Sequence, residues 1–419
     1  MRATGNSKPA DLAALPEKQL LETVQRQTFG FFWEAGHPLS GLAPDRCTTS
    51  EGPKDDLVVS GGSGFSVMAH IVAAEREWIS RAAAAERIVH MLELLSRATC
   101  YHGVFPHFMN GRTGATIPFM RKDDGGDLVE TSFLIMGLLC AREYFTRKNP
   151  RESQIRGLVN YLWSEVEWSW YARGGTALQW HWSPNNGWAL DLEIRGWNEC
   201  LIAYVLAASA PRYPIDPRVY HQGFAAGRNF LNGKPYYGIP LPLGAPFGGP
   251  LFFSQYSFCG IDPRGLADRY ADYWQQNVNH VRINRAHCVK NPLHHKGYGA
   301  SCWGLTSSDG ADGYATHAPD NDDGTISPTA AISSMPYAPK EAVRAMRHFL
   351  KAHGDRVWGR FGFVDAFNAA RNWYADTYLA IDQGPIVVMI ENHRTGLLWK
   401  LFMKAPEIQK GLRALSFTR

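Results

Sequence analysis

Apolar residues recur at helical spacing along most of the chain. From Pro16 to Ala35 they fall three and four positions apart, and Pro16 suits a first helical turn while Gly36 suits a helix end. Ser80 is placed to cap a similar segment. The same periodicity predicts further helices over residues 64–79, 81–99, 127–145, 151–168, 192–209, 217–231, 264–281, 327–334, 339–353, 366–379, 384–394 and 405–414. These patterns predict an all-α protein.

Two stretches break this periodicity. Residues 101–119 alternate apolar and polar positions around Asn110-Gly111, a typical tight hairpin turn. Residues 174–190 resemble a second hairpin, which turns at 184–187. No segment has the pattern of a strand buried on both faces, so we expect the strands to be short additions to a helical fold.

The number of helices and the long loops between them favour one architecture. About twelve helices in about 400 residues suit a toroid of paired helices, six inner and six outer, better than a short bundle. We therefore expect an (α/α)6 barrel with short β-hairpins and long loops at its mouth. Residues 233–258 and 297–326 are notable among the stretches between helices for their Gly, Pro, Asp and Trp content, and loops of this length usually carry function. Residues 1–15 are expected to be a flexible leader, and residues 16–419 a single domain.

Composition narrows the classes of partner. Hydrophobic residues make up 45% of the 419 and charged residues 20%, which excludes a disordered chain. The net charge is +4 and the basic residues are scattered, so neither nucleic acid nor a membrane surface is an expected partner. No run of about 18 apolar residues predicts a transmembrane helix, and the N-terminus lacks the apolar core of a signal peptide. The seven cysteines form no C-x-x-C pair, which argues against a zinc knuckle or a dense disulfide framework.

Carboxylates cluster where one apolar helix is expected to begin. Asp123 and Asp124 precede a Gly-Gly turn, Asp127 follows it, and Glu130 comes three positions later. Residues three apart share a helix face, so Asp127 and Glu130 should point into the same space. Because the rest of this helix is apolar nearly all round, we expect it to be buried and its acidic end to face a cleft. A capping box at Asp127 and Glu130 explains the same spacing without any catalytic role.

A second acid has a comparable position. Glu199 stands just before another apolar helical run, where an acid also interacts favourably with the helix dipole. Two such acids at one mouth could protonate a glycosidic oxygen and activate water. Crowding among the acids should raise the pKa of one of them enough to keep it protonated near neutrality. Sugars stack on aromatic rings, and tryptophans accompany these segments at positions 168, 170, 180, 182, 188, 197 and 303.

Six segments in order carry a family resemblance. They are Asp127–Leu134, Gly196–Glu199, Gly249–Phe258, Trp303–Asp309, Asp323–Ala330 and Ile381–Arg394. With them the chain resembles the bacterial glucoamylase-like glycoside hydrolases, in particular glycoside hydrolase family 144, the endo-β-1,2-glucanases and sophorose-releasing relatives. The resemblance implies an (α/α)6 barrel without metal or organic cofactor. It also implies a periplasmic or secreted enzyme whose partner is β-1,2-glucan or its oligosaccharides, although the absent leader departs from that pattern.

The resemblance also assigns roles to residues. Its essential acids fall on Asp127, Glu130 and Glu199, of which we expect Glu130 to be the general acid and Glu199 the general base. Expected substrate contacts come from an additional acid, two tryptophans and an amide: Asp123, Trp197, Trp303 and Gln383. Inner helices packed about 8–10 Å apart would hold the two carboxyls at the wider spacing of an inverting enzyme.

Other readings stay open. A transglycosylase would use the same acids, and a glucan-binding protein without activity would need none of them. A sugar epimerase on this fold would favour histidine pairs at the mouth. The sequence leaves endo or exo cleavage and the oligomeric state undecided.

Neither the histidines near 287–295 nor the acids at 320–323 have metal-ligand spacing, and the glycine-rich residues 60–64 are expected to be a turn that leads into a helix. Asp365 and Glu391 are expected to have structural roles.

Overall fold

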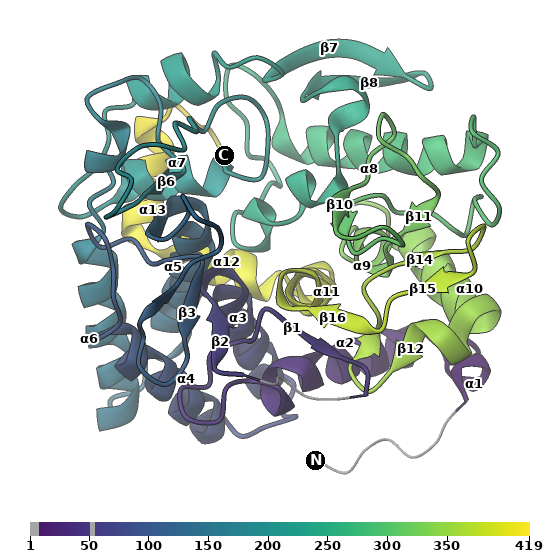
Figure 1. The fold of residues 1–419 in the computed structure, drawn as a ribbon, viewed down its shortest axis with the longest axis horizontal. Helices are drawn as coiled ribbons and strands as arrows, with labels where there is room; N and C mark the ends of the chain where they lie inside the picture. Colours follow the sequence, from purple (N-terminus) through teal and green to yellow (C-terminus); the bar gives the residue numbers. More distant parts are fainter. Residues whose placement is uncertain (1–7, 51–54) are drawn as a thin grey trace.

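A computed structural model describes residues 8–50 and 55–419, and these residues form a mostly helical protein (Figure 1). Their thirteen α-helices are α1 (Pro9–Ala13), α2 (Glu17–Glu34), α3 (Ser60–Glu75), α4 (Arg81–Leu95), α5 (Leu128–Tyr144), α6 (Pro150–Glu165), α7 (Leu201–Ser209), α8 (Tyr273–Lys290), α9 (Pro328–Ile332), α10 (Pro339–Val357), α11 (Ala380–Arg394), α12 (Leu397–Lys404) and α13 (Pro406–Ala414). Shorter helical turns are η1 (Trp170–Ala172), η2 (Tyr220–Phe224), η3 (Pro246–Gly248), η4 (Leu251–Ser254) and η5 (Ser257–Cys259).

The helices divide into a buried set and a covering set. Helices α3, α5, α7 and α11 are apolar nearly all round and almost completely buried. Helices α2, α4, α6 and α10 bury one face and expose the other. Helix α3 packs between α5 and α11, α4 packs on α6, and α10 packs on α9. The ends of the buried helices are therefore the places where polar side chains can meet in the interior.

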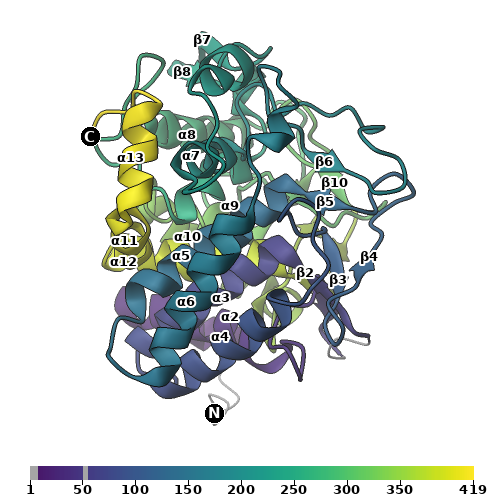
Figure 2. The same cartoon turned by 90° about the vertical axis from the view of Figure 1, so that its left-hand side faces the viewer.

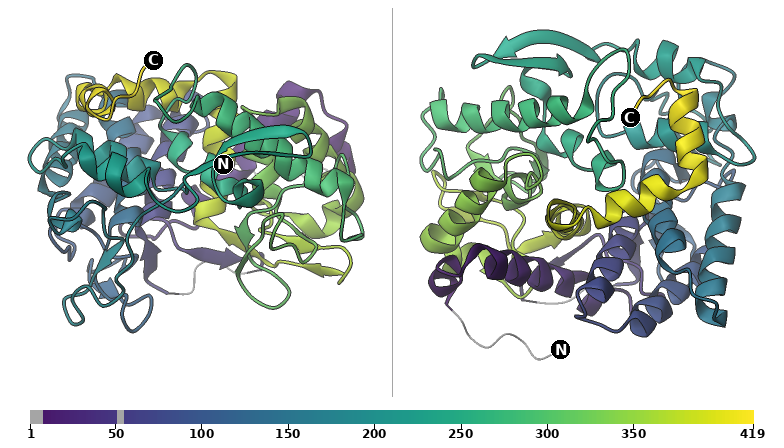
Figure 3. Two further views of the ribbon diagram at one scale, coloured as in Figure 1. Left: turned by 90° about the horizontal axis from the view of Figure 1, so that it is seen from above. Right: turned by 180° about the vertical axis from the view of Figure 1, so that it is seen from behind.

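The strands are short and lie in seven separate small sheets of the described residues. Those near the site are β1 (Arg46–Thr48), β2 (Leu57–Val59), β3 (Phe108–Asn110), β4 (Thr116–Ile117), β5 (Gly126–Asp127), β6 (His181–Trp182), β9 (Ser307–Ser308), β10 (Ala315–Thr316) and β16 (Thr377–Leu379). The others are β7 (Leu231–Tyr236), β8 (Ile239–Leu243), β11 (Thr325–Ile326), β12 (Trp358–Gly359), β13 (Gly362–Phe363), β14 (Phe367–Asn368) and β15 (Trp373–Tyr374). Strands β2 to β6 and β10 lie along one side of the molecule (Figure 2), and α12 and α13 lie on the opposite side (Figure 3).

A close contact between α3 and α5 aligns the starts of these two helices. A Cβ atom on Gly64 would lie 2.1 Å from the carbonyl oxygen of Phe133, and one on Gly137 would lie 2.1 Å from the carbonyl oxygen of Gly64. Only glycine permits this approach. Residues 60–64 are therefore not a turn, as the sequence suggested, but the first turn of α3 itself.

Several predicted helices are shorter than the pattern indicated, or absent. Residues 366–379 were expected to be helical but form β14, β15 and β16, because their backbone pairs with distant strands such as β1 and β11. In the segment 192–209 the helix begins only at Leu201, since Gly196 has a positive φ of 80°. Only Tyr220–Phe224 is helical within residues 217–231. The segment 264–281 is helical only from Tyr273, and this helix continues to Lys290.

The structure adds detail to the predicted leader and to the second hairpin. Residues 9–13 form α1, which packs on α10, so the leader is ordered at least from this helix onward. Residues 1–7 lie outside the described part of the chain. The second hairpin is present: antiparallel bridges Ser183–Gly187 and Gln179–Glu193 join its two arms across the turn near residue 185. Strand β6 within its first arm also pairs with β5. Helix α12 had not been recognised in the sequence.

Candidate active site

A cavity of about 470 Å³ opens where the strands cover the ends of the buried helices. The carboxyl-bearing residues Glu130 and Glu199 both line it. Its aromatic lining comes from Phe108, Phe119, Phe133, Trp180, Phe252, Tyr256 and Tyr314, together with the imidazole of His107. The two acids that the sequence analysis placed at one mouth therefore do face the same space.

Asp127 and Glu130 are fixed by the start of α5. Asp127 caps this helix, because its Oδ1 accepts hydrogen bonds from the backbone N–H groups of Val129 and Glu130, both at 2.9 Å. The side chain of Glu130 does not complete a capping box by reaching back to the N–H of Asp127. Instead its Oε2 accepts a 2.7 Å hydrogen bond from the N–H of Gly61 in α3. Asp127 is thus the cap, and Glu130 is free to present its carboxyl to the cavity.

Glu199 lies in the turn before α7. Its backbone carbonyl accepts a hydrogen bond from the hydroxyl of Ser257, which fixes this turn against η5. Cys200 caps α7 without a side-chain hydrogen bond. Among the described residues, no lysine or arginine forms an ion pair with Glu199 or Glu130.

The electrostatics of the cavity favour protonated acids. Burial raises the pKa of Glu130 to about 7, and the charge of Asp127 adds to this shift while that of His107 opposes it. Burial also raises the pKa of Glu199 to about 7, with further contributions from the charges of Asp127 and Glu130. Carboxyls with pKa values near neutrality can exchange protons with a substrate at physiological pH.

His107 is a site residue that the sequence analysis does not identify, whereas Trp180 is one of the seven tryptophans expected near the mouth. His107 Nδ1 lies 3.3 Å from Asp127 Oδ2, and the indole N–H of Trp180 donates to the same oxygen at 3.3 Å. Burial alone would lower the pKa of His107, but the carboxylates of Glu130 and Asp127 raise it to about 9. Nothing in the local sequence signals this contact, because His107 precedes β3 and meets Asp127 only in the folded chain.

Two further acids lie behind the opposite wall of the cavity. Tyr256 lines the cavity and its hydroxyl donates to Asp382 Oδ1 at 3.3 Å. Asp382 and Asp365 are each 2% exposed. Burial and the neighbouring Asp365 raise the pKa of Asp382 well above its usual value, and burial with repulsion from Asp309 raises that of Asp365 to about 7. Glu391 is instead paired with Arg76 far from the cavity, as a structural role requires.

The remaining predicted substrate contacts do not line the cavity. Asp123 is 9% exposed and its Oδ1 lies 3.1 Å from His181 Nε2, beside the cavity. Trp303 has no exposed surface, and Trp197 is packed among aromatic rings of the core. Gln383 is buried and donates to the carbonyl of Phe363. The prediction that these side chains contact substrate gains no support from the structure.

The other clusters singled out in the sequence have internal partners. His287 Nε2 lies 2.7 Å from Asp322 Oδ2, and its Nδ1 lies 2.8 Å from the hydroxyl of Tyr237. Within the described chain, no group of three or more His, Cys, Asp or Glu side chains is arranged to hold a metal ion. All seven cysteines are unpaired. The described helices include none long and apolar enough to cross a membrane.

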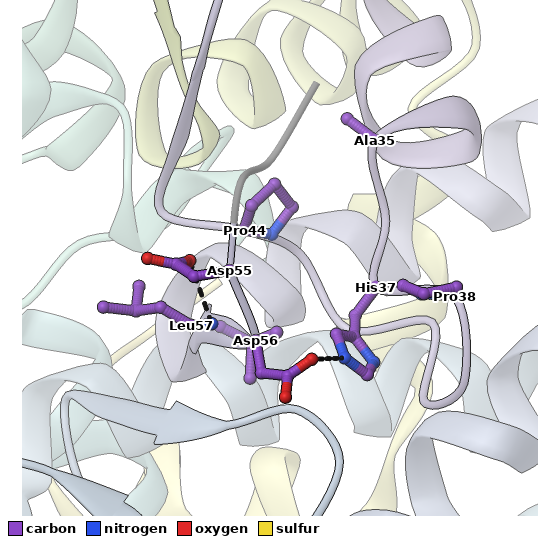
Figure 4. Close-up of a pocket in the computed structure, with 8 residues that line it drawn as sticks. Ala35, His37, Pro38, Pro44, Asp55, Asp56 and Leu57 are labelled. Carbon is purple, nitrogen blue, oxygen red and sulfur yellow. Dashed lines mark hydrogen bonds and ion pairs between the residues drawn. The ribbon is translucent and has the colours of Figure 1, made fainter. Parts of the chain in front are cut away.

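A second cavity, of about 230 Å³, lies beside β2 (Figure 4). Its two carboxylates, Asp55 and Asp56, are already engaged: Asp55 accepts from the N–H of Leu57, and Asp56 lies 3.1 Å from His37 Nε2. Unlike the larger cavity, it places no buried acid against a ring of aromatic side chains. The candidate active site is therefore the cavity that holds Glu130 and Glu199.

Comparison with known proteins shows which family the chain resembles. The Glycoamylase family model, which describes glucoamylases, matches residues 191–406, a segment that includes Glu199. An exo β-1,2-glucooligosaccharide sophorohydrolase of Parabacteroides distasonis is 41% identical over 96% of this chain. The chain spans 58% of the length of that relative.

Solved structures extend the likeness to the whole fold. An endo-β-1,2-glucanase from Chitinophaga pinensis, solved with sophorotriose and glucose, is 49% identical with a TM-score of 0.94, over 97% of this chain and 99% of that one. A β-1,2-glucanase from Parabacteroides distasonis is 41% identical with a TM-score of 0.93, over 96% of this chain and 60% of that one. The chain therefore belongs to the glucoamylase-like Glycoamylase family, and the resemblance seen in its sequence motifs is confirmed.

Proposed function

We propose that the protein is a glycoside hydrolase that cleaves β-1,2-glucan or its oligosaccharides. The observation that carries the proposal is the pair Glu130 and Glu199, two acids with pKa values near 7 that line one aromatic cavity and have no basic ion-pair partner in the described part of the chain. The choice of β-1,2 linkages rests on the names of the relatives, which act on β-1,2-glucan or its oligosaccharides.

The chemistry follows from the protonation states. Glu130, held by the N–H of Gly61, acts as general acid and protonates the glycosidic oxygen, either directly or through a substrate hydroxyl. Glu199 acts as general base and takes a proton from the water that attacks the anomeric carbon. Asp127 orients the start of α5 and, with His107, sets the charge around Glu130. We expect inversion of the anomeric configuration, because the two acids come from the ends of different buried helices.

The architecture of the protein and its location in the cell belong to the same proposal. The buried set α3, α5, α7 and α11 with its covering helices supports an (α/α)6 toroid as the underlying architecture. A periplasmic or secreted location follows from the family resemblance, and fractionation of the native host with an antibody to the protein tests it.

The activity test compares glucans that differ only in linkage or in ends. Purified protein is incubated with linear β-1,2-glucan, cyclic β-1,2-glucan, β-1,3-glucan and starch, and the products are resolved by size. We expect products from β-1,2-glucan alone, and cleavage of the cyclic polymer would show endo action. Glucose from starch without products from β-1,2-glucan would contradict the proposal. Products longer than the substrate after addition of an acceptor sugar would favour a transglycosylase.

A further inference from the structure

The rim of the cavity carries two aromatic rings that the folded chain leaves half exposed. Phe119 is 47% exposed and Tyr314 is 53% exposed, yet both line the cavity. Phe119 follows β4, and Tyr314 lies between β9 and β10, so the two rings come from distant parts of the chain. Large apolar surface left in water at a cavity mouth is unfavourable until a ligand covers it.

Both rings are carried by segments of the chain that are anchored before any ligand binds. Phe119 stacks on His107 with ring centroids 4.5 Å apart, and its N–H donates to the carbonyl of Asp123 at 2.9 Å. Tyr314 follows a tight turn closed by two hydrogen bonds between Gly310 and Gly313. That turn is tied to a neighbouring loop by the ion pair of Asp312 with Arg371. Rings fixed in this way lose little conformational entropy when they bind a ligand.

The aromatic groups around Trp170 already cover one another. Trp170 is stacked on His102 at 3.6 Å with an angle of 15°, and it also lies 4.7 Å from Trp188. Arg173 covers Trp188 at 4.9 Å. This stack fills its own faces, so it cannot receive a sugar ring as Phe119 and Tyr314 can.

The polar groups beside the two rings suit a hexose. Asp45, Arg46 and Ser307 line the same cavity. A pyranose has apolar C–H faces, which stack on aromatic rings, and hydroxyl edges, which hydrogen-bond to such side chains. Because Glu130 is only 6% exposed, a sugar at the rim lies further out than the sugar at the carboxyls.

We propose that Phe119 and Tyr314 form a rim subsite that binds a glucosyl unit of the glucan chain outside the unit held at Glu130 and Glu199. The subsite rests on the proposed function for the identity of its ligand. It makes chain length part of substrate recognition, since only an oligosaccharide long enough to reach the rim gains this contact.

The test measures kcat and KM for Phe119→Ala and Tyr314→Ala on β-1,2-linked glucooligosaccharides of increasing length. We expect KM for the long substrates to rise about tenfold in each variant, the effect of losing one aromatic contact, with kcat nearly unchanged. The shortest substrate cleaved should show little change, and Phe119→Tyr and Tyr314→Phe should retain wild-type KM. Met120→Ala and Tyr161→Ala are matched controls, because these side chains are each 51% exposed but do not line the cavity.

Three outcomes would overturn the subsite: unchanged KM at every length, an equal effect in the controls, or a loss of kcat alone at every length. The last result would mean that Phe119 only supports His107. Calorimetric binding of the same oligosaccharides to wild type and both alanine variants separates this proposal from the proposed function. Binding that weakens in the variants supports the subsite even if the wild type hydrolyses nothing, and no binding to the wild type rejects both.

Discussion

Glu130 in the cavity and Glu152 between α4 and α6 occupy the same position in their helices but have opposite surroundings. Each lies three residues after a cap whose side chain accepts its backbone N–H, Asp127 in one case and Asn149 in the other. Glu152 is 3% exposed and bonds to Arg81 at 2.9 and 3.0 Å. Glu130 is 6% exposed, and within residues 8–50 and 55–419 its carboxyl has only the N–H of Gly61 as a hydrogen-bond partner.

The two surroundings shift the pKa values in opposite directions. Hydrogen bonds from Arg81 lower the pKa of Glu152 to about 2, so this acid stays ionised and holds two outer helices together. Burial without a bonded cation raises the pKa of Glu130 to about 7. Burying an acid without an arginine partner, such as Glu152 has, lowers the stability of the fold. An acid buried in this way is typical of a catalytic group. The comparison thus separates a structural acid from a functional one by their partners.

The first prediction tests this comparison by replacing each acid with glutamine, the neutral amide of the same shape. Glu130→Gln should lower kcat roughly 10²–10⁴-fold, the usual contribution of a positioned acid or base, and Glu199→Gln should do the same. Glu152→Gln should leave kcat unchanged because it lies away from the cavity. Rates on β-1,2-glucan and circular dichroism spectra check both expectations, with Glu86→Gln on the exposed face of α4 as the control. Near-wild-type turnover in Glu130→Gln would show that its raised pKa has no catalytic meaning.

The second prediction concerns the group that holds Glu130. A Cβ atom on Gly61 would lie 2.5 Å from Glu130 Oε2, so Gly61→Ala must displace the carboxyl. We expect a loss of about 10²-fold in kcat, as for other small misplacements of catalytic groups. Gly157→Ala on α6 is the matched control, because nothing lies within 4 Å of its added Cβ atom. It should keep full activity and gain about 0.5–1 kcal/mol of stability. Equal activity in the two variants would mean that the position of Glu130 is unimportant.

The third prediction tests the structural side of the comparison. Glu152→Gln should lower the free energy of unfolding at pH 7 by about 1–3 kcal/mol, because Arg81 loses its charged partner. The folded pKa of about 2 lies below the ordinary glutamate value of 4.5, so this contribution is present above pH 4.5 and is lost as the pH falls through 2. Urea unfolding at pH 7 and pH 3 measures the difference, which should be smaller at pH 3. Glu130→Gln should show no such loss at pH 7, and a similar loss there would remove the distinction between the two acids.

The sequence predicts the local structure around Glu130 but does not predict which distant residues surround it. The apolar run after Asp127 predicts α5, its cap and the direction of Glu130, because these depend on neighbouring residues. The hydrogen-bond partner of Glu130 depends on how closely α3 approaches α5. The glycines of α3 permit this approach, but their positions in the sequence do not predict it. His107 and Trp180 reach Asp127 from other segments, so no spacing reveals them. Strand β16 fails as a predicted helix for the same reason, since its backbone pairs with β1.

The tryptophans show the same limit of prediction from sequence. Seven of them accompany the mouth segments in sequence, yet Trp180 lines the cavity while Trp303 is completely buried. Composition indicates that aromatic rings are available, but only packing decides which of them faces a ligand. The rings with the most exposed surface at the cavity are instead Phe119 and Tyr314.

The last prediction concerns the pH dependence of the activity. If Glu130 is the general acid, activity falls as the pH rises through its pKa of about 7, because the acid loses its proton. The positive charge of His107 holds that pKa down, so His107→Asn should raise it and move the alkaline limb of the kcat/KM profile upward by about one pH unit. The acid limb belongs to Glu199, whose pKa is raised by burial and by the charges of Asp127 and Glu130, so the loss of His107 reaches it only indirectly and should move it less than the alkaline limb. Profiles between pH 4 and 10 would be compared with His102→Asn, a histidine outside the cavity that pairs with Glu167. A shift of the acid limb alone would exchange the roles of the two acids, and no shift of either limb would remove His107 from the electrostatics of the site.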